Sequence, residues 1–148
     1  MTVTLRPVRP GDLPIFFAHQ CDVDAAAMAG FTPRARDAFD AHWGRILGGP
    51  AFVVRTVEVE GAVAGYVSAF PHQGRVEIAY WLGRDYWHRG IGQATVAAFL
   101  ADHRERPLFA SVIDTNAASQ AILERCGFVV VGEETGDDGV CERTLRLG

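Results

Sequence analysis

The chain contains no lysine, and all 14 of its basic residues are arginine. A Walker-type phosphate loop needs a lysine that reaches the terminal phosphates, so this route to ATP or GTP hydrolysis is excluded. No apolar run approaches the ~20 residues that span a bilayer, and the first residues lack the apolar segment of a secretory signal. We therefore expect a cytoplasmic protein without a membrane partner.

Cysteine and positive charge are also scarce. Three widely spaced cysteines, Cys21, Cys126 and Cys141, fit reduced thiols better than a disulfide framework or a metal site. The net charge of −4 lacks the basic footprint that a general nucleic-acid binder shows. We expect no metal and no nucleic-acid partner, and any anion site must be local. With 148 residues, the chain is expected to form one domain, residues 1–148.

Strand and helix signals alternate along the chain. Runs of β-branched residues bounded by turns predict strands over residues 3–9, 51–59, 62–70, 75–82, 107–113, 128–133 and 140–147. Apolar residues at helical spacing predict helices over residues 12–19, 32–48, 90–103 and 116–126, with Thr32 as the N-cap of the second. The order predicts an α/β fold with a mixed, mostly antiparallel central sheet flanked by helices, and a β–α–β unit in its second half.

The most informative stretch covers residues 86–93, where two glycines open a helix directly after a strand. The first amide N–H groups of a helix have no partner within it, and the helix dipole is positive at that end. No acidic residue caps this turn, while Arg84, His88 and Arg89 add positive charge beside it. These features favour a phosphate group; a tight turn in which glycine serves geometry alone is the alternative.

This stretch resembles the acetyl-CoA loop of the GNAT superfamily of N-acetyltransferases, in which Gln or Arg, then any two residues, precede a Gly-x-Gly or Gly-x-Ala. Gly90 and Gly92 match, whereas Trp87 stands at the Gln or Arg position. The variant is similar to that of the branch that includes ribosomal-protein N-terminal acetyltransferases. A second block, residues 116–128, resembles the family's downstream pattern in Asn116, Ser119, Gly127 and Phe128. The resemblance covers essentially the whole chain.

The resemblance implies an enzyme that moves an acetyl group from acetyl-CoA to a primary amine by direct attack. The expected acceptor is a small-molecule amine or a protein N-terminus. The alternative to an enzyme is a module that binds acyl-CoA without catalysis. A homodimer is possible on either interpretation. The pyrophosphate is expected at the amides of residues 89–94, and the pantetheine arm along the strand that ends at residue 82. The cofactor-binding residues expected on this basis are Trp81, Leu82, Arg89, Gly90, Ile91, Gly92, Gln93, Ala94, Asn116 and Ser119.

Three residues bear on the cofactor and the chemistry: Asn116, Glu77 and Leu123. Asn116 has an N-cap role as its alternative, because Asn is common at helix starts. Glu77 is the predicted base: it shares a mostly apolar face of its strand with Ala79 and Trp81, and burial raises the pKa of a carboxyl. Its alternative is an ion pair with an arginine. Leu123 replaces a tyrosine acid found in many GNAT members, so the leaving thiolate is expected to be protonated by water or by the acceptor.

Overall fold

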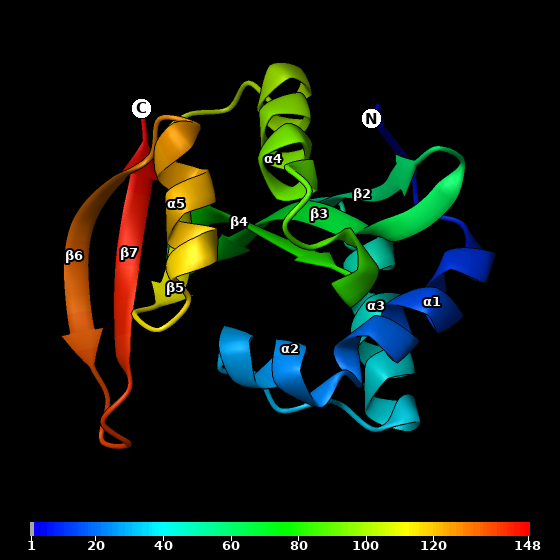
Figure 1. Ribbon diagram of the computed structural model, residues 1–148, viewed down its shortest axis with the longest axis horizontal. Coiled ribbons are helices and arrows are strands. Elements are labelled where there is room, and N and C mark those ends of the chain that lie inside the picture. Colours follow the sequence, from blue (N-terminus) through cyan, green and yellow to red (C-terminus); the bar gives the residue numbers. More distant parts are fainter. Residues whose placement is uncertain (1) are drawn as a thin grey trace.

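Seven strands form one sheet in the computed structural model, which describes residues 2–148 (Figure 1). Their order across the sheet is β1-β2-β3-β4-β5-β7-β6. The strands are β1 (Val3–Pro7), β2 (Val53–Val59), β3 (Ala62–His72), β4 (Arg75–Leu82), β5 (Leu108–Ile113), β6 (Val129–Thr135) and β7 (Cys141–Leu147). Neighbouring strands pair antiparallel, except β4 and β5, which are parallel.

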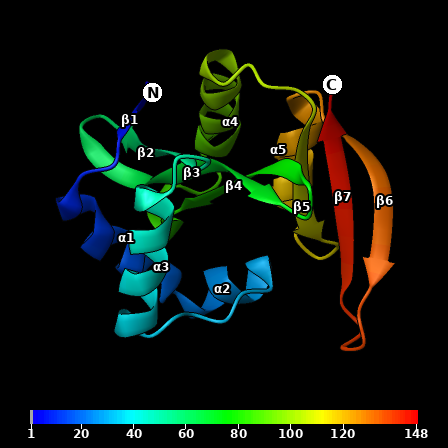
Figure 2. The same ribbon diagram turned by 180° about the vertical axis from the view of Figure 1, so that it is seen from behind.

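The helices cover both faces of the sheet. They are α1 (Leu13–Gln20), α2 (Val23–Ala29), α3 (Arg36–Gly48), α4 (Ile91–Asp102) and α5 (Ala117–Arg125), with the 3-10 turns η1 (Pro10–Asp12) and η2 (Arg84–Tyr86). Figures 1 and 2 show α4 on one side of the central strands and α1 to α3 on the other. The predicted fold, a mixed and mostly antiparallel sheet flanked by helices, is confirmed.

Each face of the sheet has its own apolar core. The larger core lies against α4 and α5 and contains Ile78, Phe99 and Leu123. The smaller core lies against α1 and α3 and is built on Phe16 and Trp43. Since side chains alternate along a strand, β2 and β3 contribute to both cores, whereas β4 and β5 contribute to the larger one.

The parallel pair β4–β5 is short. Its register has one position, Glu77 opposite Phe109. On its other edge, β4 pairs with β3 along its whole length, from Arg75 to Leu82. Beyond Glu77, therefore, the backbone of β4 on the β5 side is not paired with another strand, and this stretch leads directly to η2 and the glycine loop.

The sequence prediction missed α2. Its residues are mostly alanine, so they carry no apolar periodicity, although both ends have cap residues. The side chain of Asp22 accepts hydrogen bonds from the amides of Asp24 (3.1 Å) and Ala25 (3.2 Å). Gly30 ends the helix in the left-handed conformation, with φ of 66°. The Asp and Gly signals were present in the sequence, but the intervening alanines gave no reason to connect them.

The predicted start of α3 at Thr32 is wrong. The helix begins at Arg36, with Ala35 as its N-cap. The side chain of Gln20 holds the preceding segment: it accepts a hydrogen bond from the amide of Arg34 (2.7 Å) and donates one to the carbonyl of Arg34 (3.0 Å). Because both backbone groups of Arg34 are bound from a distant segment, they cannot join a helical ladder.

Candidate active site

The loop before α4 has an unusual backbone. His88 and Gly90 both lie in the left-handed region, with φ of 58° and 75°. Gly90 is the N-cap of α4, no side chain caps the helix, and the first turn has no acidic residue. The amide of Ala94 donates to the carbonyl of Gly90 (3.1 Å), which is the first bond of the helical ladder. The amides of residues 91–93 precede it and form the positive end of the helix.

A cavity of about 390 Å³ opens at this end of α4. It lies between α2, the end of β4, the glycine loop and α5, and its size suits a small-molecule ligand. The predicted residues that line it are Trp81, Leu82, Gly90, Ile91, Gly92, Gln93, Asn116 and Ser119. Arg89 and Ala94 are not among its lining residues, and the amide of Ala94 is already bound within the helix.

The two glycines serve different purposes. A side chain at Gly90 would meet no neighbour, but its left-handed backbone disfavours any other residue. Gly92 has ordinary helical geometry, and a Cβ there would lie 2.7 Å from Cδ1 of Ile122. Gly92 therefore lets α4 and α5 approach each other beside the cavity, while Gly90 shapes the loop.

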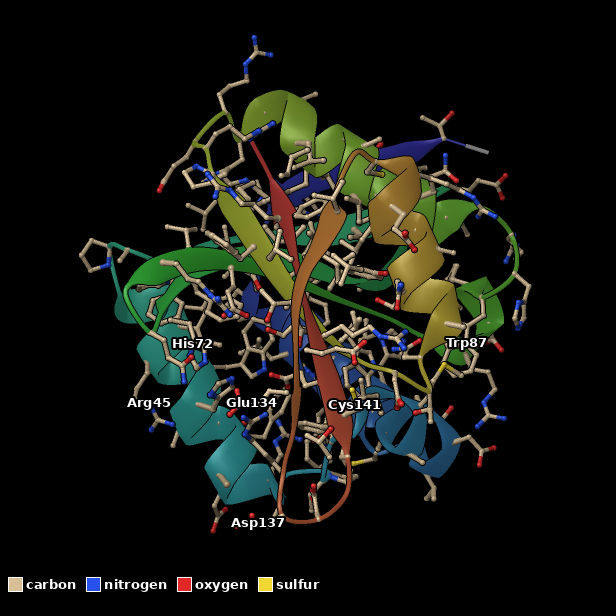
Figure 3. All side chains as sticks on the ribbon, turned by 90° about the vertical axis from the view of Figure 1, so that its left-hand side faces the viewer. Arg45, His72, Trp87, Glu134, Asp137 and Cys141 are labelled. Atoms are coloured by element: carbon tan, nitrogen blue, oxygen red, sulfur yellow. The ribbon has the colours of Figure 1, made fainter. Side chains whose placement is uncertain are left out.

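Sequence reasoning missed several residues that line the cavity. Trp87, labelled in Figure 3, donates from its ring nitrogen to the carbonyl of Leu82 (3.0 Å) and so ties the loop to the end of β4. The further lining residues that it missed are Ala25, Met28, Ala29, Tyr80, Tyr86, Ala118, Ala121, Ile122 and Arg125. His88, which the sequence analysis named beside the loop, also lines the cavity. On α5, Ile122 lies three residues after Ser119, so the helical period would have indicated it, whereas Ala121 and Arg125 continue the spacing from Ala118.

Two hydroxyl groups meet in the cavity. The Tyr80 hydroxyl lies 2.9 Å from the Ser119 hydroxyl, and both residues line the cavity. Burial raises the pKa of Tyr80, so its hydroxyl is neutral near pH 7. The amide of Ser119 donates to Oδ1 of Asn116 (3.2 Å), so the N-cap role of Asn116 is present in the structure. Leu123 lies in the core and is 1% exposed.

Glu77 is buried on the face of β4 opposite Tyr80 and is 4% exposed. One carboxylate oxygen accepts a hydrogen bond from Nε of Arg75 (3.1 Å), and the other accepts one from the Ser111 hydroxyl (3.0 Å). Glu77 is not among the residues that line the cavity. The arginine pair that the sequence left as an alternative is thus present, and the role of Glu77 as a base stays a prediction.

The charges expected beside the loop are arranged differently from the sequence prediction. The guanidinium of Arg84 binds the carboxylates of Asp22 and Asp24, so its charge is compensated and is turned toward α2. Arg89 donates to the carbonyl of Asp85 (3.0 Å). Arg125, from α5, lines the cavity instead.

Two further findings concern residues 2–148. In this part of the chain, no group of three or more His, Cys, Asp or Glu side chains is placed to hold a metal ion. No helix within the same range has the length and apolar character needed to cross a membrane.

Known structures share this fold across nearly the whole chain. Spermidine N-acetyltransferase from Vibrio cholerae, in complex with CoA and spermine, has a TM-score of 0.85 at 16% identity, over 98% of this chain and 94% of that chain. RimL, a ribosomal L7/L12 α-N-protein acetyltransferase in complex with CoA, has a TM-score of 0.82 at 16% identity, over 99% and 94%. Ribosomal-protein-alanine N-acetyltransferase from Brucella melitensis has a TM-score of 0.74 at 24% identity, over 97% and 98%.

Identities this low establish a shared fold only. Comparison with curated protein sequences gives no match. The model of the acetyltransferase (GNAT) domain, however, matches residues 2–129. That range includes the glycine loop, the cavity and all of α5. The chain therefore belongs to the GNAT acetyltransferase family, in agreement with the two sequence blocks.

Proposed function

We propose that this protein transfers an acetyl group from acetyl-CoA to a primary amine. The observation that carries the proposal is the uncapped first turn of α4, which opens onto a cavity of about 390 Å³. Unpaired amides at a helix N-terminus bind phosphate groups well. Acetyl-CoA supplies a pyrophosphate for this turn and an acetyl group activated as a thioester.

The residues present fit such a cosubstrate. The amides of residues 91–93 would hold the pyrophosphate, and Arg125 and His88 lie on the same cavity. The stretch of β4 beyond Glu77 offers backbone N–H and C=O groups that are not paired with β5. Those groups, together with Asn116, would bind the amides of the pantetheine arm, because buried backbone groups require partners.

The two proton transfers of the reaction are proposed to take place on opposite faces of β4. The amine must lose a proton, and a positioned carboxylate such as Glu77 is proposed to accept it on the face toward α1 to α3. Tyr80 and Ser119 lie toward α5, and their hydroxyl pair is a proton source for the leaving thiolate besides water and the acceptor. In this arrangement the cosubstrate and the amine reach the strand from opposite sides.

The acceptor is proposed to be a small-molecule amine or a protein N-terminus. The enzymes of the same fold named above act on spermidine or on ribosomal proteins. The cavity itself is lined by apolar, aromatic and neutral polar residues, with His88 and Arg125 as its basic groups. These residues recognise acetyl-CoA, so the choice of amine must depend on residues outside the cavity.

Two measurements test the proposal in sequence. Millimolar CoA should raise the melting temperature, because a ligand that binds only the folded state stabilises it by RT ln(1 + [L]/Kd). Acetyl-CoA-dependent thiol release should then appear with some member of a panel of amines and N-terminal peptides. Binding without thiol release across the panel would favour the non-catalytic acyl-CoA module, and no stabilisation by CoA would overturn the proposal.

A further inference from the structure

Helix α2 forms one wall of the cavity through Ala25, Met28 and Ala29. It has only seven residues, Val23–Ala29. Helices this short are unstable on their own, so contacts from elsewhere must hold α2 in place. The shape of the cavity therefore depends on whatever fixes α2.

The C-terminal end of α2 is held by packing. Gly30 ends the helix, and the ring of Phe31 contacts that of Trp81 edge-on, with centroids 5.2 Å apart. The N-terminal end is held by charge. Asp22, which caps α2, also accepts a hydrogen bond from Nε of Arg84 through its second oxygen (2.7 Å).

Arg84 lies in η2, between the end of β4 and the glycine loop. Its Nη2 binds Asp22 and also donates to Asp24 (2.8 Å), and its guanidinium lies 5.7 Å from the ring of Trp87. The Arg84 guanidinium lowers the pKa of Asp22 to about 2, so the pair stays charged at neutral pH. One arginine thus joins the first turn of α2 to the segment that carries the cofactor loop.

We propose that Asp22 and Arg84 are a positioning pair that fixes α2 against the glycine loop, so that the cavity is formed before acetyl-CoA enters it. The proposal rests on the function proposed above. Neither residue lines the cavity, so both act through the backbone and side chains of α2. A direct contact of Arg84 with a phosphate of the cosubstrate is the competing explanation.

The variants Arg84→Gln and Asp22→Asn separate the two explanations. Asn keeps an oxygen that can cap α2, so Asp22→Asn removes mainly the charge. If the pair positions α2, each variant should raise the Kd and KM for acetyl-CoA by roughly three- to fivefold, in keeping with an exposed ion pair, and leave kcat nearly unchanged. The double variant should bind no more weakly than Arg84→Gln, because Arg84→Gln already removes the contact with Asp22.

Controls sharpen the result. Arg36→Gln breaks a comparable exposed pair with Asp40 (3.2 Å) on α3 and should leave the affinity unchanged. The ratio of variant to wild-type Kd should shrink as salt rises, because exposed pairs are screened. Tighter binding in Asp22→Asn, with weaker binding in Arg84→Gln, would overturn the proposal in favour of direct phosphate contact.

Hydrogen exchange of the ligand-free protein supplies a readout that does not depend on activity. Arg84→Gln should speed exchange of the α2 amides without affecting those of α4. Unchanged exchange in α2 would overturn the positioning role. If the wild-type protein binds no acetyl-CoA, the proposed function fails, but the exchange result still decides whether the pair holds α2.

Discussion

The two faces of the sheet are organised by different means. On the face toward α4 and α5, short local patterns determine the structure: a glycine loop, an uncapped helix and an Asn N-cap. On the face toward α1 to α3 (Figure 2), side-chain hydrogen bonds hold segments that do not follow one another in the chain. Examples are Gln20 with Arg34 and Arg84 with Asp22. The structure on the face toward α4 and α5 could therefore be predicted from sequence motifs, and the structure on the face toward α1 to α3 could not.

Strand β4 connects the two faces. Its alternation places Tyr80 beside Ser119 on the α5 side and places Glu77 beside Ser111 on the other side. A single strand can thereby serve both the proposed cofactor site and the proposed acceptor site, because neighbouring side chains point to opposite faces. The predictions below test each face separately.

The largest effect is expected from Glu77→Gln, at a buried side chain that does not line the cavity. If Glu77 is the base, turnover should fall by roughly 10²–10⁴ while acetyl-CoA affinity stays unchanged. The measurement is kcat near neutral pH and the Kd for acetyl-CoA, together with the pH profile of kcat/KM in variant and wild type. Arg75→Gln is the matched control, because it removes the ion pair and keeps the carboxylate. An equal loss of turnover in both variants, with unchanged pH profiles, would show that the pair is structural.

The next largest effect is expected from substitutions of the two glycines at the start of α4. Gly90→Val forces a β-branched residue into a left-handed conformation, which costs about 1–3 kcal/mol. We expect roughly 10- to 100-fold weaker acetyl-CoA binding, measured by calorimetry. Gly92→Val should weaken binding by a different route, because its side chain meets Ile122 between α4 and α5. The variant Gly11→Val, at a glycine with no neighbour around its Cβ and no positive φ, is the control and should bind normally. Normal binding in both Gly90→Val and Gly92→Val would remove the loop from the cofactor site.

The stability of the protein in acid tests the face toward α1 to α3. Asp12 is buried and accepts hydrogen bonds from Arg6, the amide of Arg9 and Thr56. Chiefly through Arg6, its pKa falls from 3.8 to about 2. A lowered pKa in the folded state stabilises the protein above pH 4, and this stabilisation is lost as the pH falls through 4 to 2. The expected loss is roughly 2 kcal/mol in the free energy of unfolding.

Urea unfolding between pH 2 and 5 measures this contribution. Other carboxyl groups titrate in the same range, so the informative quantity is the difference in the free energy of unfolding between wild type and Asp12→Asn. That difference should narrow as the pH falls. A difference that is constant with pH would show that the charge of Asp12 does not stabilise the fold.

The smallest effect is expected at Ser119. Because water and the acceptor can also protonate the thiolate, whose thiol pKa is near 8.5, Ser119→Ala should lower kcat by less than about tenfold. Tyr80→Phe removes the other hydroxyl of the pair and is the companion variant. A collapse of kcat in Ser119→Ala, together with loss of a descending limb at high pH, would establish the hydroxyl pair as an essential acid.

The sequence by itself determined the sheet strands, the glycine loop and the family, and it offered the N-cap role of Asn116 as an alternative that the structure contains. These features depend on neighbouring residues: alternation, turn chemistry and unpaired amides at a helix start are all local. Eight of the ten predicted cofactor residues line the cavity. Six of them belong to the loop and the strand that precedes it, which are continuous in the chain, while Asn116 and Ser119 reach it because α5 packs beside α4.

Only the tertiary structure decided the rest. Helix α2 has no periodic signal, and it borders the cavity because Asp22 meets Arg84 across 62 positions of the chain. The partners of Glu77 and Tyr80 likewise come from β5 and α5, 34 and 39 positions away. Which groups surround a buried carboxylate or hydroxyl depends on how distant segments pack, and a pattern of neighbouring residues does not contain that information.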